Sequence, residues 1–182
     1  LRGYDANFSY SLHNFADTIP IEVEDGQIYV KVNIQGRDYR FNLDTGSSQG
    51  VVYQGTPLSR GVELGNVVSN DAAGYRDTIR AIQLPSFTLG RLTVSHYVAS
   101  VFKRMYSRSD YDAILGFDLF NKGLCCKIDT RRGYMIITDR RDFFDGEPGY
   151  GLRYKFGLFK QSFDADGSQV EVSLFRSDEE GT

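Results

Sequence analysis

The strongest constraint on the fold is an alternation of apolar and polar residues over residues 26–46, GQIYVKVNIQGRDYRFNLDTG. Apolar side chains occupy every second position, at Ile28, Val30, Val32 and Ile34 and then at Tyr39, Phe41 and Leu43. Successive side chains of a strand point to opposite faces, so each half predicts a strand with one buried face. The two runs meet at residues 35–37. We therefore expect a β-hairpin whose second strand ends at Asp44.

The rest of the chain extends the same pattern. Short apolar runs flank Gly90 within residues 80–102, and two more flank Arg132 and Gly133 within residues 124–138. The chain contains 12 Tyr and 13 Phe, which are frequent in strands, and helical spacing is scarce. Only residues 117–120 favour a short helix. The sequence predicts an all-β fold with one short helix.

The composition and charge of the chain argue against several classes of function. The formal net charge is −3 and no basic stripe is present, so a nucleic-acid partner is not expected. No apolar run is long enough to cross a bilayer, so no membrane span is expected in this segment. Cys125 and Cys126 are adjacent, and neighbouring strand side chains point to opposite faces. We expect buried thiols rather than a disulfide or a metal site.

A change in amino-acid composition after residue 144 suggests the domain organisation. Residues 145–151, DGEPGYG, form a Gly- and Pro-rich connector. Residues 166–174, DGSQVEVSL, then repeat the pattern of residues 25–32, DGQIYVKV. We expect an N-terminal extension over 1–20, a lobe over 21–144, and a linker with the truncated start of a second lobe over 145–182.

The first residue is Leu1 and not a methionine. We expect an upstream segment to have been removed. Such processing favours a location outside the cytoplasm, although the compartment stays open.

The candidate site is the run Asp44, Thr45, Gly46 and Ser47. It combines a carboxylate at a fixed strand end, two hydroxyls that can hold the carboxylate and its loop, and a glycine that permits close backbone approach. The same residue types are common in turns, so a solvated turn aspartate is the alternative. The preceding hairpin and the later run AILGFD (residues 113–118) favour a functional site.

Taken together, these segments resemble the retropepsin-like aspartic peptidases, including the gag-polyprotein type of aspartyl protease. The resemblance extends over about residues 26–140. It is carried in order by GQIYVKVNIQG, FNLDTGSS, DAAGYRDTIRAIQLPSFTLG, AILGFDLF and KIDTRRGYMIIT. It implies a small lobe whose strands form a closed, barrel-like arrangement.

The resemblance also implies roles for individual residues. Asp44 would be the catalytic acid, Thr45 would lock two such loops together, and Ser47 would support the outer carboxylate oxygen. Residues 70–80 would form a flap over the substrate, with Gly74 and Tyr75 near its tip.

A second group of residues is expected below the catalytic loop. Ile114, Leu115 and Gly116 would form this layer, by the same resemblance. The family cleaves an extended peptide or protein with a water molecule held between two aspartates that share one proton. It needs no metal or organic cofactor.

This chain supplies one Asp-Thr-Gly. Asp129 in KIDT is followed by Thr130 and then Arg131 where glycine is required, so we interpret Asp129 as a surface strand residue. The second aspartate is expected either from a homodimer mate or from a second lobe of a longer chain. A lobe that kept the fold and lost hydrolysis, acting as a peptide-binding or scaffolding module, is the alternative function. His13 and His96 lie far apart, without a serine or cysteine context for a catalytic triad.

Overall fold

A computed structural model describes residues 8–47, 49–70, 76–103, 110–147, 154–158, 163–164, 167–168 and 172–176. The chain divides into two compact units. One comprises residues 1–67 and 79–144, and the other comprises residues 68–78 and 145–182. None of the helices that the structure describes is long and apolar enough to span a bilayer.

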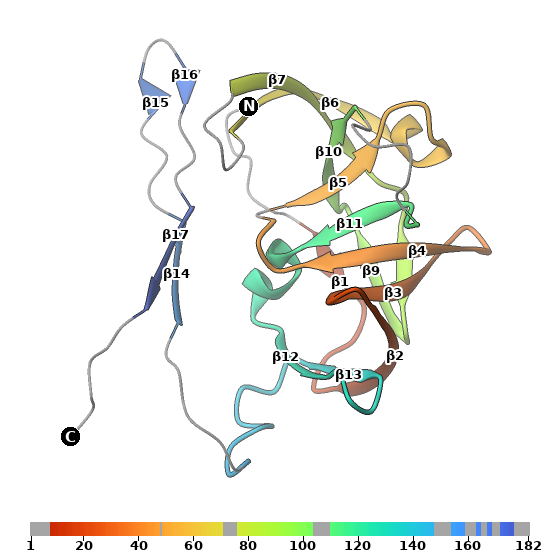
Figure 1. Ribbon diagram of the computed structural model, residues 1–182, viewed down its shortest axis with the longest axis vertical. Helices are drawn as coiled ribbons and strands as arrows, with labels where there is room; N and C mark the ends of the chain where they lie inside the picture. The colour runs from red at the N-terminus through yellow and green to blue at the C-terminus, as the bar shows by residue number, and fades with distance from the viewer. Residues whose placement is uncertain are drawn as a thin grey trace. The chain divides into compact units, whose positions relative to one another are not determined.

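Strands dominate the first unit, and its two helices are short 3-10 turns (Figure 1). The strands that precede the first helix are β1 (Ser9–Tyr10), β2 (Ala16–Glu24), β3 (Gln27–Ile34), β4 (Arg37–Asp44) and β5 (Gly50–Tyr53). After η1 (Pro57–Arg60) come β6 (Val62–Asn70), β7 (Arg76–Gln83), β8 (Phe87–Leu89), β9 (Leu92–Ser95), β10 (Val98–Phe102) and β11 (Ala113–Gly116). The helix η2 (Phe117–Lys122) then leads into β12 (Cys125–Asp129) and β13 (Tyr134–Thr138).

The alternating segment forms two consecutive hairpins. Strand β3 pairs antiparallel with β2 on one side and with β4 on the other. Asp25 and Gly26 turn the first hairpin, and Gln35 and Gly36 turn the second, all four with positive φ. Two-residue turns with positive φ match the right-handed twist of the paired strands. The predicted hairpin ending at Asp44 is confirmed.

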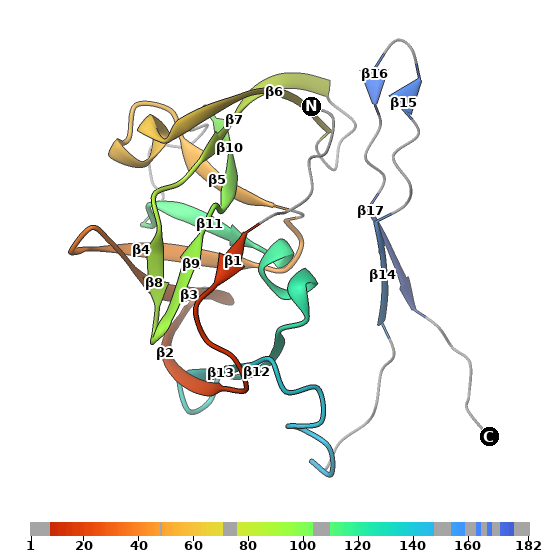
Figure 2. The ribbon, with the colours of Figure 1, turned by 180° about the vertical axis from the view of Figure 1, so that it is seen from behind.

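The sheet has two ends instead of closing on itself. Its hydrogen-bonded order is β1-β9-β8-β3-β4-β11-β5-β10-β7-β6, and β2 joins β3 to β13 and β12 as a branch. Figure 2 shows the β8 and β9 side of this arrangement. The all-β class is confirmed, whereas the closed, barrel-like arrangement expected from sequence is corrected to an open sheet. The predicted turn at Gly90 and the hairpin around Gly133 are both present.

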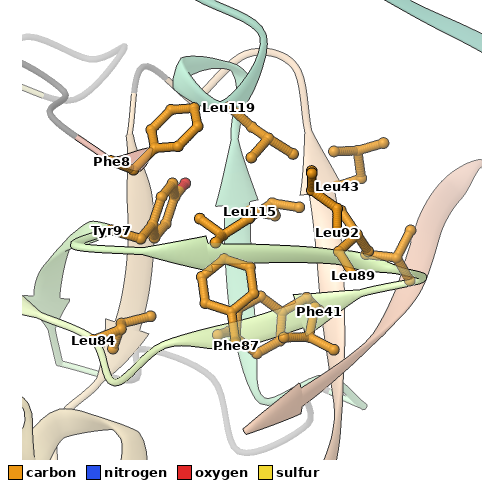
Figure 3. Packing of buried hydrophobic residues seen from close by; sticks show 14 of the residues in the cluster. Phe8, Phe41, Leu43, Leu84, Phe87, Leu89, Leu92, Tyr97, Leu115 and Leu119 are labelled. Atoms are coloured by element: carbon orange, nitrogen blue, oxygen red, sulfur yellow. The ribbon is translucent and has the colours of Figure 1, made fainter. Parts of the chain in front are cut away.

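One hydrophobic core fills the first unit, with Tyr97 and Phe87 packed edge to face at its centre (Figure 3). Leu115 of β11 and Phe41 of β4 are fully buried in it. Phe8 and Phe15 also belong to this core. The boundary predicted at residue 20 therefore falls inside β2 and does not separate an extension from the sheet.

In the second unit, β14 (Tyr154–Leu158) pairs antiparallel with β17 (Val172–Arg176). Two shorter strands, β15 (Phe163–Asp164) and β16 (Gly167–Ser168), pair with each other. Residues 172–174, the end of the repeated pattern, lie in β17. The truncated second lobe over 145–182 stays a prediction.

Truncation of Leu115 tests how strongly the core holds β11. Leu115→Ala should lower the free energy of unfolding by about 2–5 kcal/mol, because it removes a fully buried side chain and leaves a cavity. Val62→Ala is the control, since Val62 is 65% exposed and its truncation should change stability by no more than about 0.5 kcal/mol. Urea unfolding measures both. Equal losses in the two variants would contradict the assigned core.

Candidate functional site

Asp44 is the last residue of β4, where two parallel strands end side by side. Residues Phe41 to Asp44 pair with Ala113 to Gly116 of β11, so Asp44 lies directly opposite Gly116 (Figure 1). Leu43 points into the core, and alternation directs Asp44 to the other face of the sheet. The Asp44 side chain is half-buried. The strand pair thus fixes the backbone from which this carboxylate projects.

The loop after Asp44 is tied back to that residue. The Gly46 backbone N–H donates to Oδ1 of Asp44 at 2.8 Å, and the Ser47 N–H donates to the Asp44 carbonyl at 3.2 Å. A Cβ at Gly46 would lie 3.2 Å from the same Oδ1, so a side chain there would crowd the carboxylate. Among the described residues, Oδ2 of Asp44 has no hydrogen-bond partner. One oxygen is therefore anchored within the loop, and the other is unbonded as far as the described residues extend.

The hydroxyls of the loop have different surroundings. Ser47 Oγ donates to the carbonyl of Gln49 at 2.7 Å, and the Gln49 side-chain amide hydrogen-bonds to the buried Ser100 hydroxyl. Ser47 thus braces its own loop, and its expected support of the outer carboxylate oxygen stays a prediction. Thr45 is exposed. Its expected role in joining two loops stays a prediction.

Two glycines allow the loop to lie directly against the core strands. A Cβ at Gly116 would come within 2.5 Å of the Gln49 backbone, and a Cβ at Gly50 would come within 2.4 Å of the Tyr97 ring. Such short distances are incompatible with any side chain unless the backbone moves. Of the predicted lower layer, Gly116 touches the loop, Leu115 is buried in the core, and Ile114 is half-buried.

A buried carboxyl group lies beneath this loop, and sequence reasoning did not identify it. Asp118, in η2, is only 4% exposed, and its Oδ1 accepts a hydrogen bond of 2.7 Å from the Tyr97 hydroxyl. The Gly116 backbone N–H in turn donates to that hydroxyl at 3.2 Å. The signal in the sequence was an acidic residue inside the apolar run LGFDLF.

Burial raises the pKa of Asp118 to about 7, well above the ordinary value of an aspartate. Hydrogen bonds from the Tyr97 hydroxyl and from the backbone N–H groups of Leu119 and Gly50 act in the opposite direction and favour the ionised form. Desolvation is the larger effect. Asp118 therefore changes its charge close to neutral pH.

The predicted flap lies partly outside the described residues, and Gly74 and Tyr75 are among those left out. Its flanking strands, β6 and β7, are neighbours in the sheet. Arg80 of β7 donates from Nε to Glu63 of β6 at 3.0 Å. This ion pair ties together the parts of β6 and β7 that belong to the first unit. The assignment of the flap tip stays a prediction.

Asp129, the aspartate of the second Asp-Thr pair, is engaged in a hairpin turn. The Arg132 backbone N–H donates to its Oδ1 at 2.9 Å and holds its pKa below the usual value. In the described segments, no group of three or more His, Cys, Asp or Glu side chains is placed to hold a metal ion.

Comparison with known proteins relates part of this chain to a known family. Residues 30–119 match the model of a protein family described as Aspartyl protease. Among solved structures, the chain is similar to a retropepsin-like aspartic protease from Rickettsia conorii, with 18% sequence identity and a TM-score of 0.44. That alignment covers 74% of this chain and 96% of the other. No curated protein matches the sequence.

The buried Asp118 should make stability depend on pH. Its pKa in the folded chain, about 7, exceeds the ordinary aspartate value of 3.8. Between these values the unfolded chain is ionised while the folded chain retains the proton. The contribution of Asp118 to the free energy of unfolding is complete below pH 4. It is lost as the pH rises to 7, by up to about 1.4 kcal/mol per pH unit.

Asp118→Asn removes this titration. The stability of the wild type relative to the variant should therefore fall between pH 4 and 7 and stay level above pH 8. Urea unfolding of both proteins across this range measures the difference. Parallel curves would contradict a titrating carboxyl at this position.

Proposed function

Because residues 30–119 belong to the aspartyl protease family, we propose that this chain is an aspartic endopeptidase whose catalytic residue is Asp44. The observation that carries this proposal is the half-buried carboxylate at the end of β4, with Oδ1 held by the Gly46 N–H and Oδ2 without a partner among the described residues. A catalytic carboxylate has to be fixed in place and still reach a reactant. Asp44 meets both requirements.

The reaction needs a second carboxyl group close to Asp44. Two such groups share one proton, because two like charges at short distance are not both stable, and aspartic proteases are the familiar example of such a pair. The ionised member accepts a proton from a water molecule as its oxygen attacks the peptide carbonyl, and the protonated member donates to the carbonyl oxygen. As the tetrahedral intermediate collapses, the C–N bond breaks and the aspartate that took the proton from water transfers it to the leaving amine nitrogen. The other aspartate recovers a proton from a hydroxyl of the intermediate, which restores the pair.

The second aspartate comes from outside this Asp-Thr-Gly loop. Asp129 does not supply it, since its carboxylate is engaged by Arg132 in the β12–β13 turn. Two sources remain: a homodimer mate that contributes its own Asp44, or a second lobe of a longer chain. Both place a copy of the same loop opposite the first.

The substrate we propose is an extended peptide or protein segment. The face of the sheet that carries Asp44 also carries Ile114 and Val51, which pair with each other across β11 and β5. Asn42 pairs with Ile114 across β4 and β11 and lies on the same face. Asn42 and Val51 are buried and Ile114 is half-buried, so Ile114 is the side chain of this face that an apolar peptide side chain would contact. The peptide backbone would form strand-like hydrogen bonds with the lobe.

Replacement of the proposed catalytic residue tests the function directly. Asp44→Asn in the full-length protein should lower kcat for peptide cleavage by about 100-fold or more, because an amide cannot accept the proton from water. Asp129→Asn is the matched control and should leave cleavage unchanged. Cleavage of a library of unstructured peptides, followed by mass spectrometry, provides the rates.

Two outcomes would count against the enzyme. Undiminished cleavage by Asp44→Asn would show that another residue acts. Tight binding of a statine-containing peptide by a wild-type protein that cleaves nothing would favour the inactive peptide-binding module. In that second case the lobe would bind peptides without hydrolysing them.

A further inference from the structure

The backbone on both sides of the catalytic loop lies against one buried cluster. At the end of the loop, Gly50 packs so closely against Tyr97 that a Cβ there would lie 2.4 Å from its ring. Beside Asp44, the backbone N–H of Gly116 bonds to the Tyr97 hydroxyl, which bonds to Asp118. Tyr97 and Asp118 are 1% and 4% exposed, so water does not replace these contacts readily.

The direction of these hydrogen bonds is fixed by chemistry. A backbone N–H can only donate, so the Tyr97 oxygen accepts from Gly116 and its own hydrogen is directed to Asp118 Oδ1. The backbone N–H groups of Leu119 and Gly50 favour the ionised form of the same carboxyl and lower its pKa. Asp118 is therefore the common acceptor of the cluster, and an apolar residue of similar size could not replace it.

We propose that Asp118 and Tyr97 are positioning residues that hold the catalytic loop in the geometry in which Asp44 can react. The inference rests on the proposed function, since it concerns the same loop. Neither residue touches the substrate in this assignment. Both act through Gly50 and Gly116, whose backbones flank the loop in sequence and in space.

The close approaches around the loop show why a hydrogen-bonded anchor is needed here. The Gln49 backbone lies against Gly116, and the Tyr97 ring lies against Gly50, at distances that exclude a side chain. A shift of Tyr97 or Asp118 would therefore be passed to the loop backbone. Misplacement of a catalytic group by about 1 Å can cost about 100-fold in rate.

The variants that test the proposal remove one contact at a time in the full-length protein. Tyr97→Phe deletes only the hydroxyl, and Asp118→Leu deletes the acceptor while keeping a similar volume. Asp118→Asn retains one acceptor oxygen and serves as the conservative variant. The matched controls are Tyr10→Phe and Asp17→Asn. Asp17 is likewise a buried aspartate, but its carboxylate accepts from Arg91 in the turn between β8 and β9.

The kinetic readout separates positioning from a loss of folding. We expect Tyr97→Phe and Asp118→Leu to lower kcat by about 10- to 100-fold. We expect KM to stay within about 2-fold, because the surface that binds the peptide is intact. Asp118→Asn should recover part of the loss, and both controls should match the wild type. Rates are measured on protein shown to be folded by its near-UV circular dichroism.

A second readout does not depend on activity. The Gly46 amide, which bonds to Asp44 Oδ1, and the Gly50 amide, at the end of the loop against Tyr97, should exchange with solvent at least about 10-fold faster in Tyr97→Phe. NMR hydrogen exchange measures both amides, with Tyr10→Phe as the control. Unchanged exchange of Gly46 in a folded Tyr97→Phe protein would overturn the proposal.

The kinetic and exchange measurements also distinguish a failure of the proposed enzyme function from a failure of the proposed positioning role. If the wild type cleaves no peptide while loop exchange still rises in Tyr97→Phe, the proposed function fails and the positioning role stands. If exchange rises but kcat is unchanged, the cluster holds the loop without serving catalysis, and the proposal is overturned.

Discussion

The parallel pairing of β4 with β11 is the constraint on which the site depends. It places Gly116 opposite Asp44 and brings the loop after Asp44 down onto the start of η2. Parallel neighbours cannot be joined by a short turn, so all of the chain from β5 to β10 lies between them in sequence. The loop after Asp44 is therefore supported by residues that lie much later in the chain. The site can form only after the sheet has assembled.

The two carboxyl groups in this region, Asp44 and Asp118, lie in different environments. Asp44 is half-buried with one oxygen available, whereas Asp118 is enclosed and surrounded by hydrogen-bond donors. Burial disfavours the ionised form of a carboxyl group, and for this reason the pKa of Asp118 rises to about 7. The loss of stability that accompanies ionisation of Asp118 therefore falls directly beneath the loop that positions Asp44.

Local patterns predicted the parts of the fold that are themselves local. Both strands of the hairpin that ends at Asp44 were indicated by the alternation over residues 26–46 and by the turns at Gly26 and Gly36. Alternation and turn residues act between near neighbours in the chain, so the sequence alone reveals them. The importance of Tyr97 and Asp118 depends on contacts between segments far apart in the chain. The sequence marks Asp118 only as an acidic residue inside an apolar run, and Tyr97 has no sequence pattern of its own. The open sheet and the role of Phe8 in the core likewise depend on long-range pairing.

The most direct test of the account is a crystal structure of the full-length protein with a bound statine-containing peptide. The account predicts that the statine hydroxyl lies within about 3 Å of the Asp44 carboxylate, where the attacking water would lie. It also predicts that a second aspartate contacts the same hydroxyl from the opposite side. A peptide bound elsewhere, or an Asp44 carboxylate with no second carboxyl group near it, would contradict the account.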